Sequence, residues 1–224
     1  MTLSIAARCA KTGMLGVAIS SSSPAVAARC PYARASVGAV STQNITNPTL
    51  GPRALDLMEL GATPEEAMAI IRRSDHIEFR QVIIVDAQGR TATFSGSGTL
   101  GTHAVAQGHG AVAGGNLLAS KKVPQHMIDA FAAGEGEAFG ERLLRALEAG
   151  IAAGGEAGPV HSAGLLLVDE VPWPVASLRV DWAEHDPVAE LRKVWHIYEP
   201  QMADYVRRAL DPKSAPSYGV PGDR

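Results

Sequence analysis

Strands in this sequence are predicted in adjacent pairs, while the helices fall into separate groups. Residues 2–8 alternate between polar and apolar, the turn-forming KTG comes next at 11–13, and residues 14–20 form a second apolar run. A further hairpin is predicted over 79–95, where DAQG at 86–89 joins FRQVIIV to RTATFS. A doubly wound sheet needs regular strand-helix-strand crossovers, which this order lacks. The pattern therefore favours an α+β fold with antiparallel sheets.

The remaining predicted elements complete two sheets and two groups of helices. Further strands are predicted at 36–43, 103–107, 111–113, 163–168 and 177–181, and further helices at 53–60, 64–73, 124–133 and 138–152. A last helix begins after the N-cap Asp186 and is expected to end where Glu199-Pro200 interrupts it. Helices grouped in this way suit the outer faces of stacked sheets. We predict a four-layer αββα sandwich, in the order helix-sheet-sheet-helix.

The 224 residues are expected to form one domain, because no linker-like change of composition divides them. Residues 1–210 are assigned to this domain. Residues 211–224 contain three prolines and are expected to form a loose C-terminal tail. With 46% hydrophobic and only 19% charged residues, the composition excludes intrinsic disorder.

Charge and hydropathy exclude two classes of partner. The formal net charge is −3, so there is no overall positive field to hold nucleic acid. No apolar run approaches the ~20 residues that cross a bilayer.

No signal-peptide pattern is present, so we expect a cytoplasmic protein. In that compartment Cys9 and Cys30 are expected to be two buried thiols. A disulfide or a nucleophilic role is the alternative for them. A homodimer is expected only because two-fold assemblies are common.

Three familiar motifs carry no function here. GSGTLG at 96–101 matches the GxGxxG pattern, but residues 102–107 alternate like a strand, so a glycine-rich turn is favoured over dinucleotide binding. The seven histidines form no HxH pair, HExxH helix or cysteine-histidine pair at ligand spacing, so no metal site is predicted. No G-x-S-x-G elbow is present to place a serine nucleophile.

Thr2 is the hydroxyl of most interest. A residue this small in second position is compatible with the removal of Met1, which would leave a threonine with a free α-amine. An α-amine has a pKa of about 7.7–8.0, so it can take the hydroxyl proton as the hydroxyl attacks a carbonyl. Many ordinary proteins begin with Met-Thr, so this residue alone does not establish catalysis.

The wider pattern resembles one known family over residues 2–195. The matching runs are TLSIAAR at 2–8, TG at 12–13 with LGVA at 15–18, PYARASVGAVSTQ at 31–43, NP at 47–48 with GP at 51–52, RQV at 80–82, GNLLA at 115–119 and DPVAELR at 186–192. In combination they resemble the Ntn-hydrolase-like domain-of-unknown-function family 1028. That resemblance implies the same αββα sandwich, with the first strand presenting Thr2 between the two sheets.

The resemblance also implies a set of site residues. Thr2 would be the nucleophile, Arg34 the nearby positive charge, and Asn116, after Gly114-Gly115, a backbone or amide contact. A surface ion pair is the alternative for Arg34, and a turn-capping amide is the alternative for Asn116. Residues 41–44, which include Gln43 and Asn44, would supply oxyanion donors.

Two functions remain open at this point. The first is an amidohydrolase that uses Thr2 on a small amide or N-acyl substrate, without cofactor or metal. The second is a catalytically inactive protein of the same fold that binds a small polar ligand, oriented by Arg34, Asn44 or Arg80. In either case Ser4 should face the same side as Thr2 and act as a hydrogen-bond partner.

Overall fold

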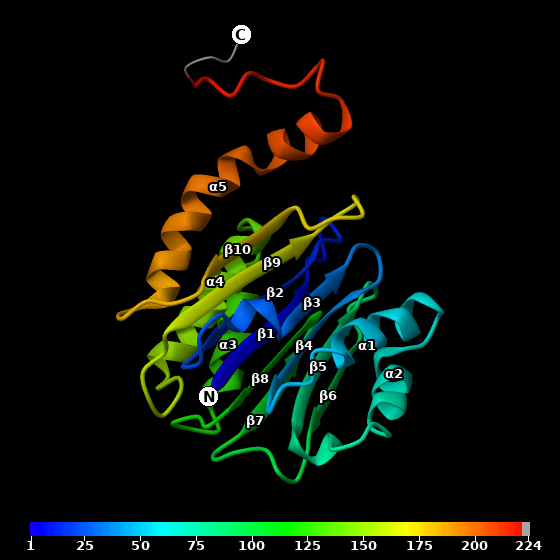
Figure 1. Ribbon diagram of the computed structural model, residues 1–224, viewed down its shortest axis with the longest axis vertical. Helices are drawn as coiled ribbons and strands as arrows, with labels where there is room; N and C mark the ends of the chain where they lie inside the picture. The colour runs from blue at the N-terminus through cyan, green and yellow to red at the C-terminus, as the bar shows by residue number, and fades with distance from the viewer. Residues whose placement is uncertain (221–224) are drawn as a thin grey trace.

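The computed structural model describes residues 1–220, which form two stacked antiparallel sheets with helices on both outer faces (Figure 1). The larger sheet has the strand order β10-β9-β2-β1-β8-β7, and the smaller has the order β3-β4-β5-β6. The predicted αββα sandwich is confirmed.

The strands of the larger sheet are β1 (Thr2–Arg8), β2 (Leu15–Ser21), β7 (Ala104–Gly108), β8 (Ala111–Asn116), β9 (Ser162–Val168) and β10 (Ala176–Val180). Those of the smaller sheet are β3 (Pro31–Arg34), β4 (Gly38–Asn44), β5 (Arg80–Asp86) and β6 (Thr91–Ser95). The α-helices are α1 (Leu50–Glu59), α2 (Pro64–Ile71), α3 (Val123–Ala133), α4 (Phe139–Ala152) and α5 (Pro187–Leu210). Two short 3-10 helices cover Val26–Ala28 and Ile77–Phe79.

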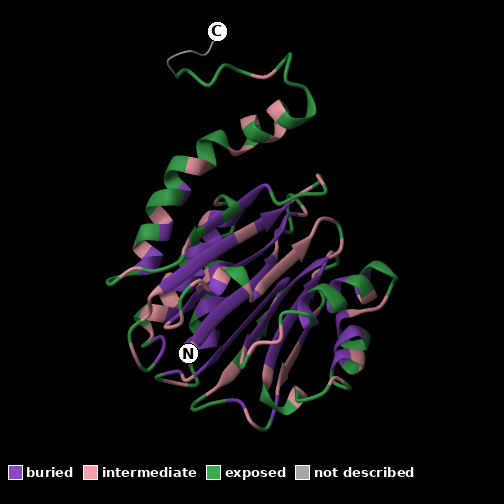
Figure 2. Ribbon diagram, in the orientation of Figure 1, coloured by how far each residue is buried: buried purple, intermediate pink, exposed green. Residues whose placement is uncertain are grey.

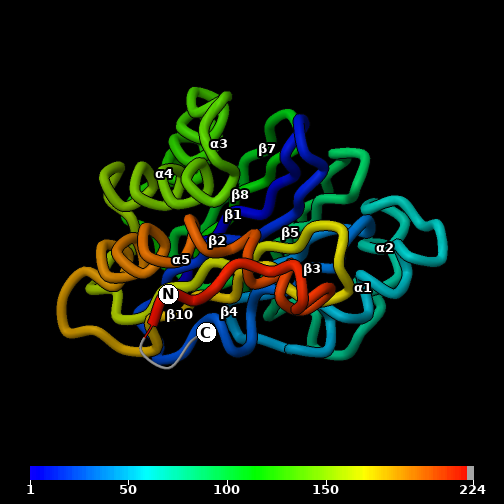
Figure 3. The backbone as a smooth tube through the Cα atoms, turned by 90° about the horizontal axis from the view of Figure 1, so that it is seen from above, coloured from blue at the N-terminus to red at the C-terminus, as the bar shows by residue number. Residues whose placement is uncertain are grey.

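The period-two alternation of the strands divides the core into three apolar layers. In β1, Leu3 and Ile5 face the layer under α3 and α4, while Ala6 faces the smaller sheet. Helices α1 and α2 cover the outer face of the smaller sheet, on the side opposite α3 and α4 (Figure 3). The strands between these layers are mostly buried, whereas the outward helix faces are exposed (Figure 2). The odd-numbered side chains of β1 therefore pack under α3 and α4, and the even-numbered ones lie between the two sheets.

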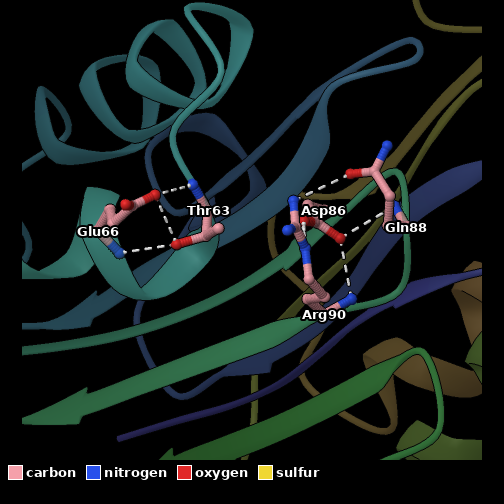
Figure 4. Close-up of polar contacts among 5 residues, drawn as sticks. All are labelled: Thr63, Glu66, Asp86, Gln88 and Arg90. Atoms are coloured by element: carbon pink, nitrogen blue, oxygen red, sulfur yellow. Dashed lines mark hydrogen bonds and ion pairs between the residues drawn. The ribbon is translucent and has the colours of Figure 1, made fainter.

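The start of α2 and the turn between β5 and β6 are stabilised by local hydrogen bonds (Figure 4). The Thr63 side chain accepts a hydrogen bond from the Glu66 backbone, while the Glu66 carboxylate accepts one from the Thr63 backbone, and this capping box begins α2. In the β5–β6 turn, Asp86 Oδ1 accepts hydrogen bonds from the backbone N–H groups of Gln88 and Arg90, and Oδ2 accepts one from Arg90 Nε at 2.6 Å. This turn fixes the register of the second predicted hairpin.

Two sequence expectations were wrong. Helix α5 does not end at Glu199-Pro200 but continues to Leu210, with Pro200 inside it. The Gln201 side-chain amide donates to the carbonyl of Ile197 at 2.9 Å, which supplies a bond near the proline. The short strand β3 was not predicted as a strand. It begins with Pro31 and lies at a sheet edge, where a missing N–H is tolerated.

The described part of the predicted tail, residues 211–220, contains no helix or strand. It folds back toward the end of α5, because Arg208 donates to the carbonyls of Pro216 and Ser217 and lies over the Tyr218 ring. Residues 221–224 of that tail lie outside the described residues. Among the helices of residues 1–220, none has the length and apolar character needed to cross a membrane.

Candidate functional site at the head of the first strand

Thr2 begins β1, a central strand of the larger sheet. It pairs with Ser21 of β2 on one side and with Asn116 of β8 on the other. Residues directly opposite in antiparallel strands point to the same face, so all three side chains face the smaller sheet. Thr2 is only 6% exposed, and Ser21 and Asn116 are buried. The structure thus places three polar side chains in one row. Thr2 and Asn116 were expected at the site from the sequence, and Ser21 was not.

The hydroxyls of Thr2 and Ser21 converge on one carbonyl. Thr2 Oγ1 donates to the Met1 carbonyl oxygen at 2.6 Å, and Ser21 Oγ donates to the same oxygen. The two hydroxyl oxygens lie 3.3 Å apart, and the backbone N–H of Ser23 donates to Ser21 Oγ at 3.1 Å. Met1 therefore occupies the position directly in front of the Thr2 hydroxyl.

A buried hydrogen-bond network joins the two sheets behind this row. Ser4 Oγ donates to Gln43 Oε1 at 2.6 Å, and Gln43 Nε2 donates to Gln81 Oε1 at 2.8 Å. Asn116 Nδ2 donates to the same Gln81 oxygen at 3.3 Å. The Gln81 amide in turn donates to Ser95 Oγ and to the backbone carbonyl of residue 115. Buried polar groups are costly unless paired, so this network holds its members in fixed positions.

Glu156 is a buried acid beside the row, and our sequence reasoning missed it. It is 7% exposed; its Oε2 accepts a hydrogen bond from the Ser22 backbone at 3.2 Å, and its Oε1 has no partner among the described residues. Burial raises its pKa to about 8, although the amine of Met1 and the bond from Ser22 act in the opposite direction. In the sequence it is a lone acid within GGEAG at 154–158, directly after the predicted helix at 138–152.

Arg34 is not brought to Thr2. It ends β3 opposite Gly38, at the other end of β4 from Gln43. Its guanidinium forms ion pairs with Asp56 at 2.8 Å and Glu59 at 2.7 Å on α1. These carboxylates raise the pKa of Arg34 further above its usual range. The surface ion pair considered as its alternative role is what the structure contains.

Asn44 ends β4 and Arg80 begins β5, and both bind the loops at that end of the smaller sheet. They are paired across β4 and β5, next to the Gln43–Gln81 pair, so they point to the opposite face from those two glutamines. Asn44 donates to the Phe79 carbonyl at 2.6 Å and accepts from the Leu100 backbone at 3.2 Å, and Arg80 donates to the Ile45 carbonyl. Neither side chain lies in the row with Thr2.

The other motifs singled out in the sequence have structural partners. Within GSGTLG, the backbone N–H groups of Gly96 and Gly98 donate to the carbonyls of Arg80 and Glu78, and the next element is the strand β7. The glycine-rich turn is therefore confirmed. Cys9 and Cys30 are both buried and unpaired. Within the described chain, no group of three His, Cys, Asp or Glu residues is placed to hold a metal ion.

Fold and site together define a class: a four-layer αββα protein whose central strand opens on a buried row of hydroxyl and amide side chains. The sequence matches, over residues 2–191, the family described as "Family of unknown function (DUF1028)". The chain belongs to this DUF1028 family.

The solved structures that match include one from Silicibacter pomeroyi and one from Yersinia bercovieri. The DUF1028 protein SPO2555 from Silicibacter pomeroyi is 26% identical, with a TM-score of 0.83, and the match covers 92% of this chain and 94% of that one. Anbu, described as an ancestral beta-subunit, from Yersinia bercovieri, is 10% identical with a TM-score of 0.36, over 92% and 97% of the two chains. No curated protein matches the sequence.

Proposed function

We propose that this protein is an N-terminal-nucleophile amidohydrolase in which Thr2, after removal of Met1, attacks a small amide or N-acyl substrate. One observation carries the proposal. The Thr2 hydroxyl lies at the head of a central strand, 2.6 Å from a carbonyl oxygen that Ser21 also binds. The same residue would carry the α-amine once Met1 has gone. Nucleophile and base would then belong to one residue, and the Ser21 hydroxyl lies 3.3 Å from the Thr2 hydroxyl.

The reaction balances with groups from this chain and water. Thr2 Oγ bonds to the substrate carbonyl carbon while its proton passes to the Thr2 α-amine. The amide C–N bond breaks as the leaving nitrogen takes that proton. Water then attacks the Thr2 ester, gives a proton through the α-amine to Thr2 Oγ, and releases the acid. An α-amine with a pKa of about 7.7–8.0 is suited to both transfers near neutral pH.

Two neighbours support the reacting groups. Ser21 Oγ donates to the Met1 carbonyl oxygen and would donate to a substrate oxygen in the same place. Asn116 lies across the ladder from Thr2 with its amide bonded to Gln81, so we assign it a positioning role. Ser4 and Gln43 are assigned to the support of this network, not to substrate contact.

Covalent labelling by a β-lactone, which acylates activated hydroxyls, tests the proposal. The wild-type protein and Thr2→Ser should be labelled, and Thr2→Ala should not. Alanine in second position is as small as serine, so the variants differ in the hydroxyl and not in the size that permits Met1 removal. Equal labelling of Thr2→Ala and the wild type would contradict the proposal.

A catalytically inactive ligand-binding protein is the second candidate. Two observations favour this candidate. The Met1 carbonyl is bonded to the Thr2 hydroxyl, and the polar side chains behind Thr2 are already hydrogen-bonded to one another. The same experiment separates the two functions. A binding protein with Met1 retained would remain unlabelled in wild-type form.

A further inference from the structure

The Met1 residue fills a small site of its own in front of Thr2. Its carbonyl accepts hydrogen bonds from Thr2 and Ser21, as described above. Its thioether side chain lies against Gly158, where an added Cβ would come within 2.8 Å of the Met1 methyl carbon and 3.5 Å of the sulfur. The site therefore holds a carbonyl and an apolar side chain of one amino acid.

Glu156 is a buried acid next to this site. Its Oε2 is bonded to the backbone of Ser22, next to Ser21, whose hydroxyl binds the Met1 carbonyl. Its Oε1 is buried and has no partner within residues 1–220. The charge of the Met1 amine acts on this carboxyl and favours its ionised form. A buried carboxylate oxygen without a partner is costly, and an ammonium group is a ligand that would stabilise it.

The acyl-enzyme would place its acyl group almost where Met1 lies. Met1 is an aminoacyl group attached to the nitrogen of Thr2, and the acyl-enzyme would carry an aminoacyl group on Oγ of the same residue. Thr2 Oγ1 is already within 2.6 Å of the Met1 carbonyl oxygen. An aminoacyl ester of Thr2 could therefore direct its ammonium group to Glu156 and its side chain to Gly158.

We propose that the substrates are amides of α-amino acids with a free ammonium group and an unbranched apolar side chain, and that Glu156 is the residue that recognises the ammonium group. This inference rests on the proposed function of Thr2. The products of the reaction are the free amino acid and the released amine. Glu156 takes no part in breaking the C–N bond, and its role is confined to binding.

A pair of matched amides tests the inference on the wild-type protein with Met1 removed. Methioninamide and its deamino analogue differ only in the ammonium group. We expect kcat/KM for methioninamide to exceed that for the analogue by roughly 30-fold or more, as for other buried charge pairs. Methioninamide should also protect Thr2 from the β-lactone at lower concentration than the analogue does, which gives a readout independent of turnover.

The variant Glu156→Gln adds a second arm with the same shape and no charge. It should lose most of the preference for methioninamide while the reaction of Thr2 with an uncharged β-lactone continues. Glu170→Gln, at an exposed carboxylate, is the matched control and should keep the wild-type preference. Thermal melting of each variant verifies that it is folded.

The outcomes distinguish the two claims. If the β-lactone labels Thr2 but the two amides compete and react equally, or Glu156→Gln retains the preference, the inference on substrate class is overturned and the proposed function stands. If the β-lactone does not label Thr2, both are overturned. Labelling together with a preference that depends on Glu156 supports both.

Discussion

The sequence predicts the position of Thr2 in the fold but not that of Glu156. Thr2 follows from its place in the chain and from the alternation of TLSIAAR, which puts Leu3 and Ile5 in one layer and Thr2 and Ser4 in the other. Glu156 could not be predicted in this way. Its burial depends on a loop from far along the chain that reaches Ser22, directly after β2, and glycine-flanked acids are usually solvated.

Glu156 makes the stability of the protein depend on pH. Its pKa is raised from 4.5 to about 8, so the folded state retains a proton that the unfolded state loses between these values. Unfolding then releases a proton, and the contribution of this group to the free energy of unfolding falls as pH rises from about 4.5 to about 8. Above that range the penalty is constant.

The variant Glu156→Gln removes this titration. Its Tm relative to the wild type should increase by roughly 10 °C as pH rises from about 5 to about 8.5. A pKa raised from 4.5 to about 8 changes the free energy of unfolding by about 4 kcal/mol over this range, and each kcal/mol shifts Tm by about 2–4 °C in a chain of this size. Thermal melts of both proteins across this pH range measure the difference. A difference in Tm that stays constant with pH would show that Glu156 ionises normally in the folded state.

At the scale of single elements, local signals in the sequence predicted most of the structure. Proline and acids after Thr63 predicted the start of α2, and a glycine-containing turn predicted the β5–β6 hairpin. The path of α5 through Pro200 could not be predicted locally. Tyr198 before Pro200 and Met202 and Val206 after it pack against the same apolar core, and this tertiary packing outweighs the local cost of proline.

The capping box of α2 gives a prediction at this scale. Thr63→Ala removes the acceptor for the Glu66 backbone N–H and should lower the free energy of unfolding by about 1 kcal/mol. Thr63→Ser keeps a hydroxyl and should lower it by much less. Urea denaturation of both variants compares them. Equal losses would mean that the methyl group of Thr63, and not its hydroxyl, stabilises the helix.

For the molecule as a whole, the layer order was predictable and the attachment of α5 was not. Gly140 of α4 faces Trp195 of α5, where an added Cβ would lie 2.5–2.9 Å from ring carbons. This close approach joins the C-terminal helix to the rest of the protein. Nothing in the local sequence of either helix identifies its partner, because helix periodicity shows which face is buried but not against what.

The variant Gly140→Ala tests that contact, because the contact decides whether the free energy of unfolding falls or rises. Gly140 lies in the first turn of α4, where alanine is favoured over glycine by at most about 1 kcal/mol, whereas a clash with a packed ring costs about 1–3 kcal/mol. We expect net destabilisation in urea denaturation. The same change made in a Trp195→Leu background should be neutral or stabilising, since the smaller side chain leaves room. An identical cost in both backgrounds would contradict the close contact.

The homodimer expected from the frequency of two-fold assemblies stays a prediction at this scale. Light scattering of the purified protein should give twice the chain mass of 23.4 kDa. A mass of 23.4 kDa that does not change with concentration would rule the dimer out.

The proposed catalysis requires Thr2 to act as a nucleophile once Met1 has been removed. The decisive test is mass spectrometry of the untagged protein before and after treatment with a β-lactone, with the modified residue located by fragmentation. We predict a chain that is lighter by one methionine residue and an adduct on Thr2. A folded protein that retains Met1, or whose Thr2 remains unmodified, would contradict N-terminal catalysis.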